Sequence, residues 1–510
     1  MRRVLLLVLV VAGLIAAALG PVLTPSSEGP SFRPVSSALL VCPELTGAGA
    51  ASSALSAVVA GPVQPVGGAA LRPMTATTDL VRLLAPGDPV ALVSPSGSQG
   101  PVLLQADGSW APTALAGIST RQRTDLNQGL SSAPCVPPGP SWWFVGAGSQ
   151  LGRGAALLVA NPADEPARFD ISLFAAAGPV QALAGKGIDL GPRSNVRLRL
   201  DALAPDQDLL AIRVSTTSGR VAAAVRDVAV PSDQRARGVD FIPAAQPPAD
   251  RLVIAGIPVG SGERFLVLVN PGDQFATVTP ALLTETGPEP IDGLATIAVP
   301  AGSVIQVDLA RVLDGRAASL DLRSDAPITG GARAAWGGAT RDVTWLSAVP
   351  TLGGPEPLGG AAAVLAGPGL TTTVTIAAPD QAVRGELTVT TSTSAQTAAL
   401  TDPQAAAPAG SGPLQVALLD PPDVRTQTVS VPAGAQRTLT VSQDASAQEG
   451  GEGLISVTWR AAPESGPAAI SHLTLDEAIP LATGYPWWPV LSTVAAVGVR
   501  EDLGILAPPD

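Results

Sequence analysis

One segment of this 510-residue chain recurs roughly 108 residues later, and a repeat of that period constrains the fold more than any other feature. In each copy an apolar run is followed by an Asn-Pro pair, a polar turn and a second apolar run. Asn161 of the first copy matches Asn270 of the second, and Val196 further along matches Val304 at nearly the same offset. Collinear markers at one offset predict tandem copies of one folded unit.

A more divergent third copy follows these two. Pro379 matches Pro271 at the same offset, whereas Gly434 matches Gly302 at a clearly larger one. An insertion of about 20 residues therefore separates the two markers, and the stretch 401–412, which is rich in Ala, Pro, Gly and Ser, is its expected place as a surface loop.

The pattern within each copy favours strands. Runs of four to eight apolar or alternating residues are separated by turns, and the chain contains 54 Gly and 51 Pro. We expect an all-β protein of tandem immunoglobulin-like β-sandwich repeats, because about 100 residues with many short strands is the size of such a domain. A propeller is the alternative, but its three or four blades would be too few, and each would be too long.

The repeats and the Pro/Gly-rich links at 244–250 and 351–360 set the expected organisation. It comprises a membrane anchor at 1–23, a linker at 24–35, an N-terminal β region at 36–140, β-sandwich repeats at 141–247, 248–350 and 351–485, the last with the inserted loop, and a C-terminal tail at 486–510.

The first residues predict export. Arg2 and Arg3 precede an uninterrupted apolar run from Val4 to Leu23, and a helix of about twenty residues spans the hydrocarbon layer. Because basic residues are retained inside, the body lies outside the cytoplasm. We expect a single-pass protein of the cell membrane. A cleaved signal peptide with small residues at 16–18 is the alternative.

Cys42 and Cys135 are the two cysteines of the chain. An even pair in an exported protein predicts a disulfide, and a bridge closing a loop of about 90 residues contributes on the order of 4 to 5 kcal/mol in the loop-entropy description. Two free thiols are the alternative.

Reactive side chains are scarce. The chain has one His, one Lys and one Tyr, whereas acid/base, nucleophilic and zinc chemistry rely heavily on such residues. We therefore expect no enzyme, no metal site and no cofactor. The single histidine, His472, has acidic neighbours but no accompanying nucleophile motif. A glycosidase, which needs only two carboxylates, is the enzymatic alternative.

The charge excludes one class of partner. The net charge is −12 and the basic residues form no cluster, whereas nucleic-acid binding requires a basic footprint. We expect no nucleic-acid partner.

Two tryptophan pairs are the candidate contact residues. Trp142 and Trp143 open the first repeat, and Trp487 and Trp488 follow the third. Paired indoles can stack on sugar rings or form a partner surface. The alternative is that they fill junctions between domains, because both pairs lie at repeat boundaries.

Residues 135–180, CVPPGPSWWFVGAGSQLGRGAALLVANPADEPARFDISLFAAAGPV, resemble an uncharacterised family of exported, single-span proteins from high-GC Gram-positive bacteria. The shared pattern is Cys, then Trp-Phe-Val-Gly, then Asn-Pro in a strand-turn-strand. The resemblance implies a location in the cell envelope and, through genes that neighbour a membrane glycosyltransferase, an accessory role in envelope polysaccharide assembly. It implies no activity.

Together these features predict a non-catalytic, membrane-anchored scaffold or partner-binding protein outside the cytoplasm, with envelope proteins or glycans as partners. A carbohydrate-binding protein that uses the tryptophan pairs is the alternative.

Overall fold

The computed structural model shows a mostly β protein with several antiparallel sheets, which confirms the predicted fold class at that level. It describes residues 32–47, 51–59, 66–76, 79–83, 90–93, 97–122, 128–229, 238–291, 293–336, 342–353, 358–366, 369–399, 415–419, 423–441, 453–476, 481–488 and 493–495. The expected anchor at 1–23 and the inserted loop at 401–412 lie outside these residues. Among the described residues, no helix is long and apolar enough to cross a membrane.

The chain divides into two compact units. In the smaller unit, β1 (Phe32–Pro34) pairs antiparallel with β38 (Thr493–Ala495). These strands come from the segments expected as linker and tail, so residues near the two ends of the chain pair with each other. The larger unit spans residues 35–492.

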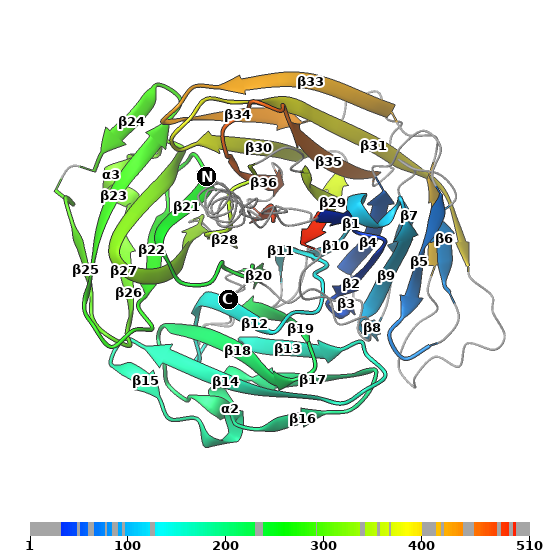
Figure 1. Ribbon diagram of the computed structural model, residues 1–510, viewed down its shortest axis with the longest axis horizontal. Helices are drawn as coiled ribbons and strands as arrows, with labels where there is room; N and C mark the ends of the chain where they lie inside the picture. The colour runs from blue at the N-terminus through cyan, green and yellow to red at the C-terminus, as the bar shows by residue number, and fades with distance from the viewer. Residues whose placement is uncertain are drawn as a thin grey trace, which may run out of the picture. The chain divides into compact units, whose positions relative to one another are not determined.

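Four successive regions make up the larger unit, and we call them the first (37–134), second (141–242), third (249–347) and fourth (358–486) regions. The first, second and fourth regions each contribute strands to two larger sheets, and the strands of the third region form one eight-stranded sheet (Figure 1). The first region also contains a two-stranded sheet, β3-β8 (Leu45–Gly47, Gly97–Gln99). In the first region the strand orders are β2-β9-β5-β6 (Ser37–Cys42, Val102–Gly108, Gly67–Pro73, Val81–Leu83) and β11-β10-β4-β7 (Gly129–Pro134, Ala114–Gln122, Ala51–Val59, Val90–Val93).

The second region contains β12-β18-β14-β15 (Ser141–Ala147, Leu210–Ser218, Ala167–Ala175, Gly178–Val180), with β16 (Ile188–Leu190) beside β14, and β17-β13-β19-β20 (Ser194–Arg199, Ala156–Asn161, Ala222–Val228, Val239–Ile242). A four-residue helix, α2 (Leu200–Leu203), precedes β18.

The strands of the third region are paired around one long strand, β27 (Ala318–Ala335). The first part of β27 pairs with β21 and β23 (Ala249–Ile257, Ala276–Thr284), and its last part pairs with β22 and β28 (Glu263–Val269, Val343–Ser347). The strands β24 and β25 (Gly287–Pro290, Ile297–Val299) pair with β23, β26 (Val304–Asp308) pairs with β22, and α3 (Ala310–Leu313) follows β26.

The fourth region contains β34-β30-β36-β37 (Ala435–Val441, Leu370–Ala378, Ala469–Asp476, Leu481–Pro486) and β29-β35-β31 (Leu358–Ala366, Gly453–Ala461, Val383–Ala399), with β33 (Asp423–Val431) beside β31. The strand β31 continues into pairing with β32 (Gln415–Leu419), which pairs with β7 of the first region. A single sheet therefore joins the first and fourth regions.

The Asn-Pro segments of the second and third regions fold alike. The Asn161 side chain donates to the carbonyl of Glu165 at 2.8 Å and accepts the N–H of Ala163 at 3.1 Å. Asn270 donates to Gln274 at 2.7 Å and accepts the N–H of Gly272 at 3.0 Å, so both partners recur at the offset of the repeat. Because each amide is buried and satisfied by the turn that follows it, the amide fixes that turn.

Each region has its own hydrophobic core of mainly Val, Leu, Ile and Ala between its strands, and the cores meet at shared side chains. Trp345 of the third region packs into the core of the second. Its ring lies against Gly146, where φ is +114° and an added Cβ would lie 2.1 Å from Trp345 Cζ3. Only glycine fits at this junction.

Candidate functional site

The strands β11, β20, β28 and β37, which we call the inner strands, close the larger unit. Each is the last long strand of its region and lies at the edge of a sheet, with one side paired to β10, β19, β27 or β36 respectively. The strand β11 contacts β20 and β37, and β28 contacts the same two strands, so the four regions form a closed cycle of contacts (Figure 1). Buried strand edges leave backbone N–H groups that require acceptors.

The carboxylate of Asp342 supplies those acceptors. Its Oδ2 accepts the N–H of Leu130 at 3.1 Å and of Ala482 at 2.8 Å, and its Oδ1 accepts the N–H of Val343 at 2.9 Å. The backbone N–H of Val239, at the start of β20, also lowers the pKa of this carboxyl group. One fully buried side chain therefore receives backbone N–H groups from β11, β28 and β37 and interacts with the start of β20.

Asp240 forms a second set of hydrogen bonds that links inner strands of different regions. Its Oδ1 accepts the N–H of Ser132 at 3.1 Å, the N–H of Phe241 at 2.8 Å and the hydroxyl of Thr483 at 2.8 Å. This carboxyl links β20 to β11 and β37. Asp240 and Asp342 both have no solvent exposure, so no sugar substrate reaches this pair of acids.

Glycines make room for the Asp342 carboxylate. A Cβ built on Gly129 would lie 2.9 Å from Asp342 Oδ1, and one built on Gly238 would lie 2.7 Å from the same atom. These residues directly precede Leu130 and Val239, whose N–H groups interact with the carboxylate. The space between the inner strands therefore accommodates the side chain of Asp342, which directly precedes β28, and has no room for a side chain at Gly129 or Gly238.

Polar contacts between neighbouring regions supplement the inner strands. Arg121 of β10 forms a buried ion pair with Asp476 of β36, with 3.0 Å between Nε and Oδ2. Arg251 of the third region contacts Asp321 at 2.7 Å and also Asp380 of the fourth region. The buried Arg121–Asp476 pair is costly to break from one side, because the remaining charge loses its partner.

Cys42 and Cys135 are joined by a disulfide, as predicted from the sequence. The bridge spans 93 residues and lies within the core of the first region, where Cys42 is 0% exposed and Cys135 is 6% exposed. It ties the end of β2 to the residue that follows β11, and thereby anchors one of the inner strands.

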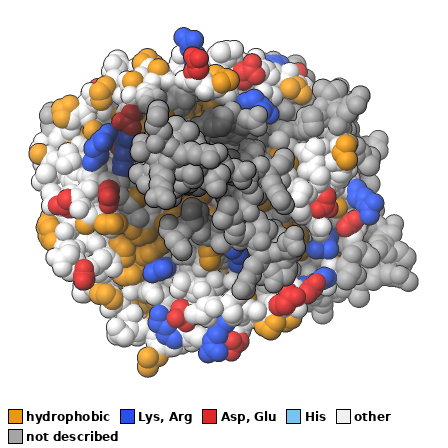
Figure 2. Space-filling model, viewed as in Figure 1, with side chains coloured by type: hydrophobic (Ala, Val, Ile, Leu, Met, Phe, Trp, Pro, Cys, Tyr) orange, Lys and Arg blue, Asp and Glu red, His pale blue; other side chains and the backbone are white. Residues whose placement is uncertain are grey.

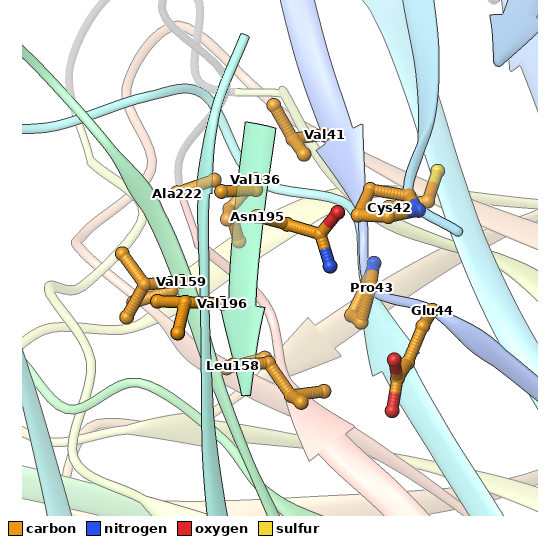
Figure 3. Close-up of a pocket in the computed structure, with 14 residues that line it drawn as sticks. Val41, Cys42, Pro43, Glu44, Val136, Leu158, Val159, Asn195, Val196 and Ala222 are labelled. Atoms are coloured by element: carbon orange, nitrogen blue, oxygen red, sulfur yellow. The ribbon is translucent and has the colours of Figure 1, made fainter. Parts of the chain in front are cut away.

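A crevice beside this disulfide separates the first and second regions. Val41, Cys42 and Pro43 line one side, and Leu158 and Val196 lie on the other (Figure 3). Asn195 and Glu44 are its polar lining side chains, and Glu44 is paired with Arg197. The space between them suffices for about one water molecule, so the crevice is a packing seam rather than a ligand pocket.

The candidate tryptophans are placed inside the protein. Trp143 is 3% exposed and stacks on Phe174 with ring centroids 5.7 Å apart, and Trp142 is half-buried with its indole N–H donating to Val221 at 2.8 Å. In the second pair, Trp487 is 1% exposed and Trp488 donates to Ala244. A sugar platform requires exposed indole faces, so this geometry favours the interpretation that both pairs fill junctions.

His472 is a structural residue in this arrangement. The Trp487 indole N–H donates to His472 Nδ1 at 3.1 Å, and the Tyr485 ring lies edge-on with centroids 4.3 Å apart. Burial lowers the pKa of His472 to about 3, so the ring is neutral at physiological pH. Within the described residues, no group of three or more His, Cys, Asp or Glu is arranged to hold a metal ion.

Two loops present apolar side chains to solvent at equivalent positions. Leu151 is 93% exposed in the loop between β12 and β13, and Val259, at the corresponding position of the next repeat, is 62% exposed between β21 and β22. The first loop is held by Ser149, whose N–H donates to Gln207 O at 2.8 Å. In the second, the N–H of Gly260 donates to Gly315 O at 2.9 Å.

Each loop is therefore tied to a neighbouring segment by a backbone hydrogen bond next to its exposed apolar residue. On the face seen in Figure 2, basic and acidic side chains are interspersed with apolar ones rather than separated into patches.

Sequence reasoning missed Asp240, Asp342, Leu151 and Val259. Asp240 lies in the short strand β20 and Asp342 directly precedes β28, and nothing in the local pattern distinguishes them from surface carboxylates. The apolar loop residues could have been found, because they are separated by the same offset that defines the repeat.

Comparison with curated proteins finds no match, and comparison with solved structures finds none either. The profile of a family of unknown function, DUF5719, matches residues 90–412, which is more than half of the chain. The matched range includes the Asn-Pro segments of the second and third regions and both Asp240 and Asp342. The chain therefore belongs to the family of unknown function DUF5719.

Proposed function

We propose that this protein is a non-catalytic scaffold of the cell envelope, held to the membrane by its N-terminal segment, with the body outside the cytoplasm. In this proposal the four regions derive from immunoglobulin-like β-sandwiches, and the body binds envelope proteins that assemble envelope glycans. The buried disulfide supports the location, because disulfides persist in exported proteins.

The proposal rests on the observation that the reactive side chains lie in contacts within the protein. The two cysteines, His472, Asp240 and Asp342 all lie in internal contacts, and the last two join regions to one another. These groups stabilise one arrangement of the body rather than take part in a reaction. Such a body suits the presentation of surface loops to a partner.

The partner contact that we propose is formed by Leu151 and Val259. Exposed apolar side chains on loops tied by backbone hydrogen bonds contribute to binding without a large entropic cost of fixing the loop. Their recurrence at the repeat offset gives two equivalent contacts, and two weak contacts to one partner strengthen each other.

Crosslinking in intact cells, followed by identification of the proteins that co-purify with the full chain, tests this function. The wild-type chain is expected to retain a specific envelope protein, and the double variant Leu151→Asp, Val259→Asp is expected to lose it. Leu183→Asp is the matched control, since Leu183 is 87% exposed outside both loops and its replacement should leave the partner in place. Recovery of no specific partner, or equal loss in the control, would contradict the proposal.

A further inference from the structure

Asp240 and Asp342 differ in how their oxygens are satisfied. Both oxygens of Asp342 accept backbone N–H groups, Oδ1 from Val343 and Oδ2 from Leu130 and Ala482. A proton on Oδ2, which already accepts two N–H groups, would displace a donor. The arrangement therefore suits the ionised form of Asp342, because hydrogen bonds to a carboxylate favour its charge.

Asp240 has the opposite pattern. Its Oδ1 takes all three of its hydrogen bonds, from Ser132, Phe241 and Thr483, while its Oδ2 is buried and has no hydrogen-bond partner among the described residues. A negative charge on such an oxygen would cost several kcal/mol. A proton on Oδ2 removes that charge and leaves the three bonds to Oδ1 intact.

The two acids are also near enough to influence each other. Burial raises the pKa of Asp240 well above its usual range, and the charge of Asp342 raises it further, against the effect of the hydrogen bonds. Burial raises the pKa of Asp342 as well, but its N–H donors oppose the rise. Two buried carboxyls in one cluster commonly share one proton.

We propose that Asp240 and Asp342 hold one proton between them at neutral pH, that this proton resides on Asp240 Oδ2, and that its release loosens the contacts among the four inner strands. The contacts among the four inner strands, which hold the regions together, then depend on pH. This inference concerns the body itself and is independent of the partner contact.

The other ionisable groups around the pair are accounted for. The strands β11 and β28 carry none besides the residue Asp342 that precedes β28. Those on the strands packed against the inner strands include His472 and Asp476 on β36, Tyr485 on β37, Arg121 on β10, Arg226 and Asp227 on β19, Asp250 and Arg251 on β21, and Asp321, Arg323, Asp325 and Arg333 on β27. Arg121 pairs with Asp476, and Asp227 pairs with Arg153 at 2.6 Å.

The direction of the pH effect follows from the raised pKa. Asp240 is protonated in the folded protein at pH values where an unfolded aspartate, with a pKa of about 3.9, has already lost its proton. Its contribution to stability is complete below the unfolded pKa and is lost as pH rises through the folded pKa. Alkaline conditions therefore weaken the contacts among the four inner strands.

Infrared spectroscopy of the full chain tests the proposal, since a protonated carboxylic acid has a C=O band distinct from that of a carboxylate. At neutral pH the wild-type protein should show the band of one protonated acid per chain, and Asp240→Asn should lose it. Asp423→Asn, at an exposed carboxyl, is the matched control and should keep the band.

A urea titration from pH 5 to 9 supplies the second readout on the same proteins. The wild-type midpoint should fall with rising pH while the folded protein keeps the acid band, because only the unfolded chain has released the proton there, and it should level off as the band disappears. Asp240→Asn should lose this part of the slope. If the Asn variant does not fold, the wild-type protein alone still tests the proposal: the fall of its urea midpoint should end at the pH where its acid band disappears. Absence of the band at neutral pH, or its persistence in a folded Asp240→Asn protein, would overturn the proposal.

Discussion

The backbone N–H of Leu130 donates to the carboxylate of Asp342, a residue 212 positions further along the chain. The same oxygen accepts the N–H of Ala482, another 140 positions on. These two bonds bring the first, third and fourth regions to a single atom. The contact explains how edge strands from four regions can be buried together without leaving their N–H groups unsatisfied.

Gly129→Ala should lower the free energy of unfolding by about 1 to 3 kcal/mol, because the new Cβ would lie 2.9 Å from Asp342 Oδ1 in a packed interior. Gly68→Ala is the matched control, since a Cβ there meets nothing within 4 Å. The urea midpoints of the two variants check the prediction. Equal midpoints would show that the space beside Asp342 is not tightly filled.

Gly146→Ala should separate the second and third regions, because its Cβ would lie 2.1 Å from the Trp345 ring. Gly178→Ala shares the positive φ, +117° against +114°, but has open space around its Cβ. The difference between the two midpoints therefore isolates the ring contact from backbone strain. We expect Gly146→Ala to be less stable by at least about 2 kcal/mol.

Replacing both cysteines with serine should lower stability by about 4 kcal/mol, as expected for a bridge between cysteines 93 residues apart. Thiol labelling of the denatured, unreduced wild-type protein gives an independent check. No label should be incorporated before reduction, and two labels per chain without reductant would contradict the bridge.

His472 predicts an acid-sensitive contribution to stability. Its pKa is about 3 in the folded protein, against about 6.5 when unfolded, so the unfolded chain binds the extra proton between these values. Stability should therefore fall as pH decreases from 6.5 towards 3. The variant His472→Gln should show a shallower decline in this window, whatever its stability at pH 7. An unchanged slope would exclude this titration.

Local patterns predicted much of the architecture. The Asn-Pro segments were recognisable because Asn161 and Asn270 bond within their own turns, so the information lies within a few residues. The cysteine pair was predictable because the apolar N-terminal segment indicates export, and disulfides persist in exported proteins. The turns depend on residues within one segment, and the disulfide pairing was predictable because the chain has only two cysteines to pair.

The joint at the centre of the larger unit was not predictable in the same way. Asp342 interacts with residues in all four regions, and its role arises only after each region has placed its last strand. The glycines that surround it, Gly129 and Gly238, resemble ordinary turn residues in the sequence. The pairing of β7 with β32 likewise joins the first region to the fourth and follows no local pattern.

Hydrogen–deuterium exchange of the full-length wild-type protein and of Asp342→Asn tests the central claim most directly. The variant keeps the size of the side chain but places an NH₂ group among N–H donors. Amides of β11, β20, β28 and β37 should all lose protection together, while Asp423→Asn leaves them protected. Loss of protection confined to β28 would contradict the claim that Asp342 holds the four regions closed.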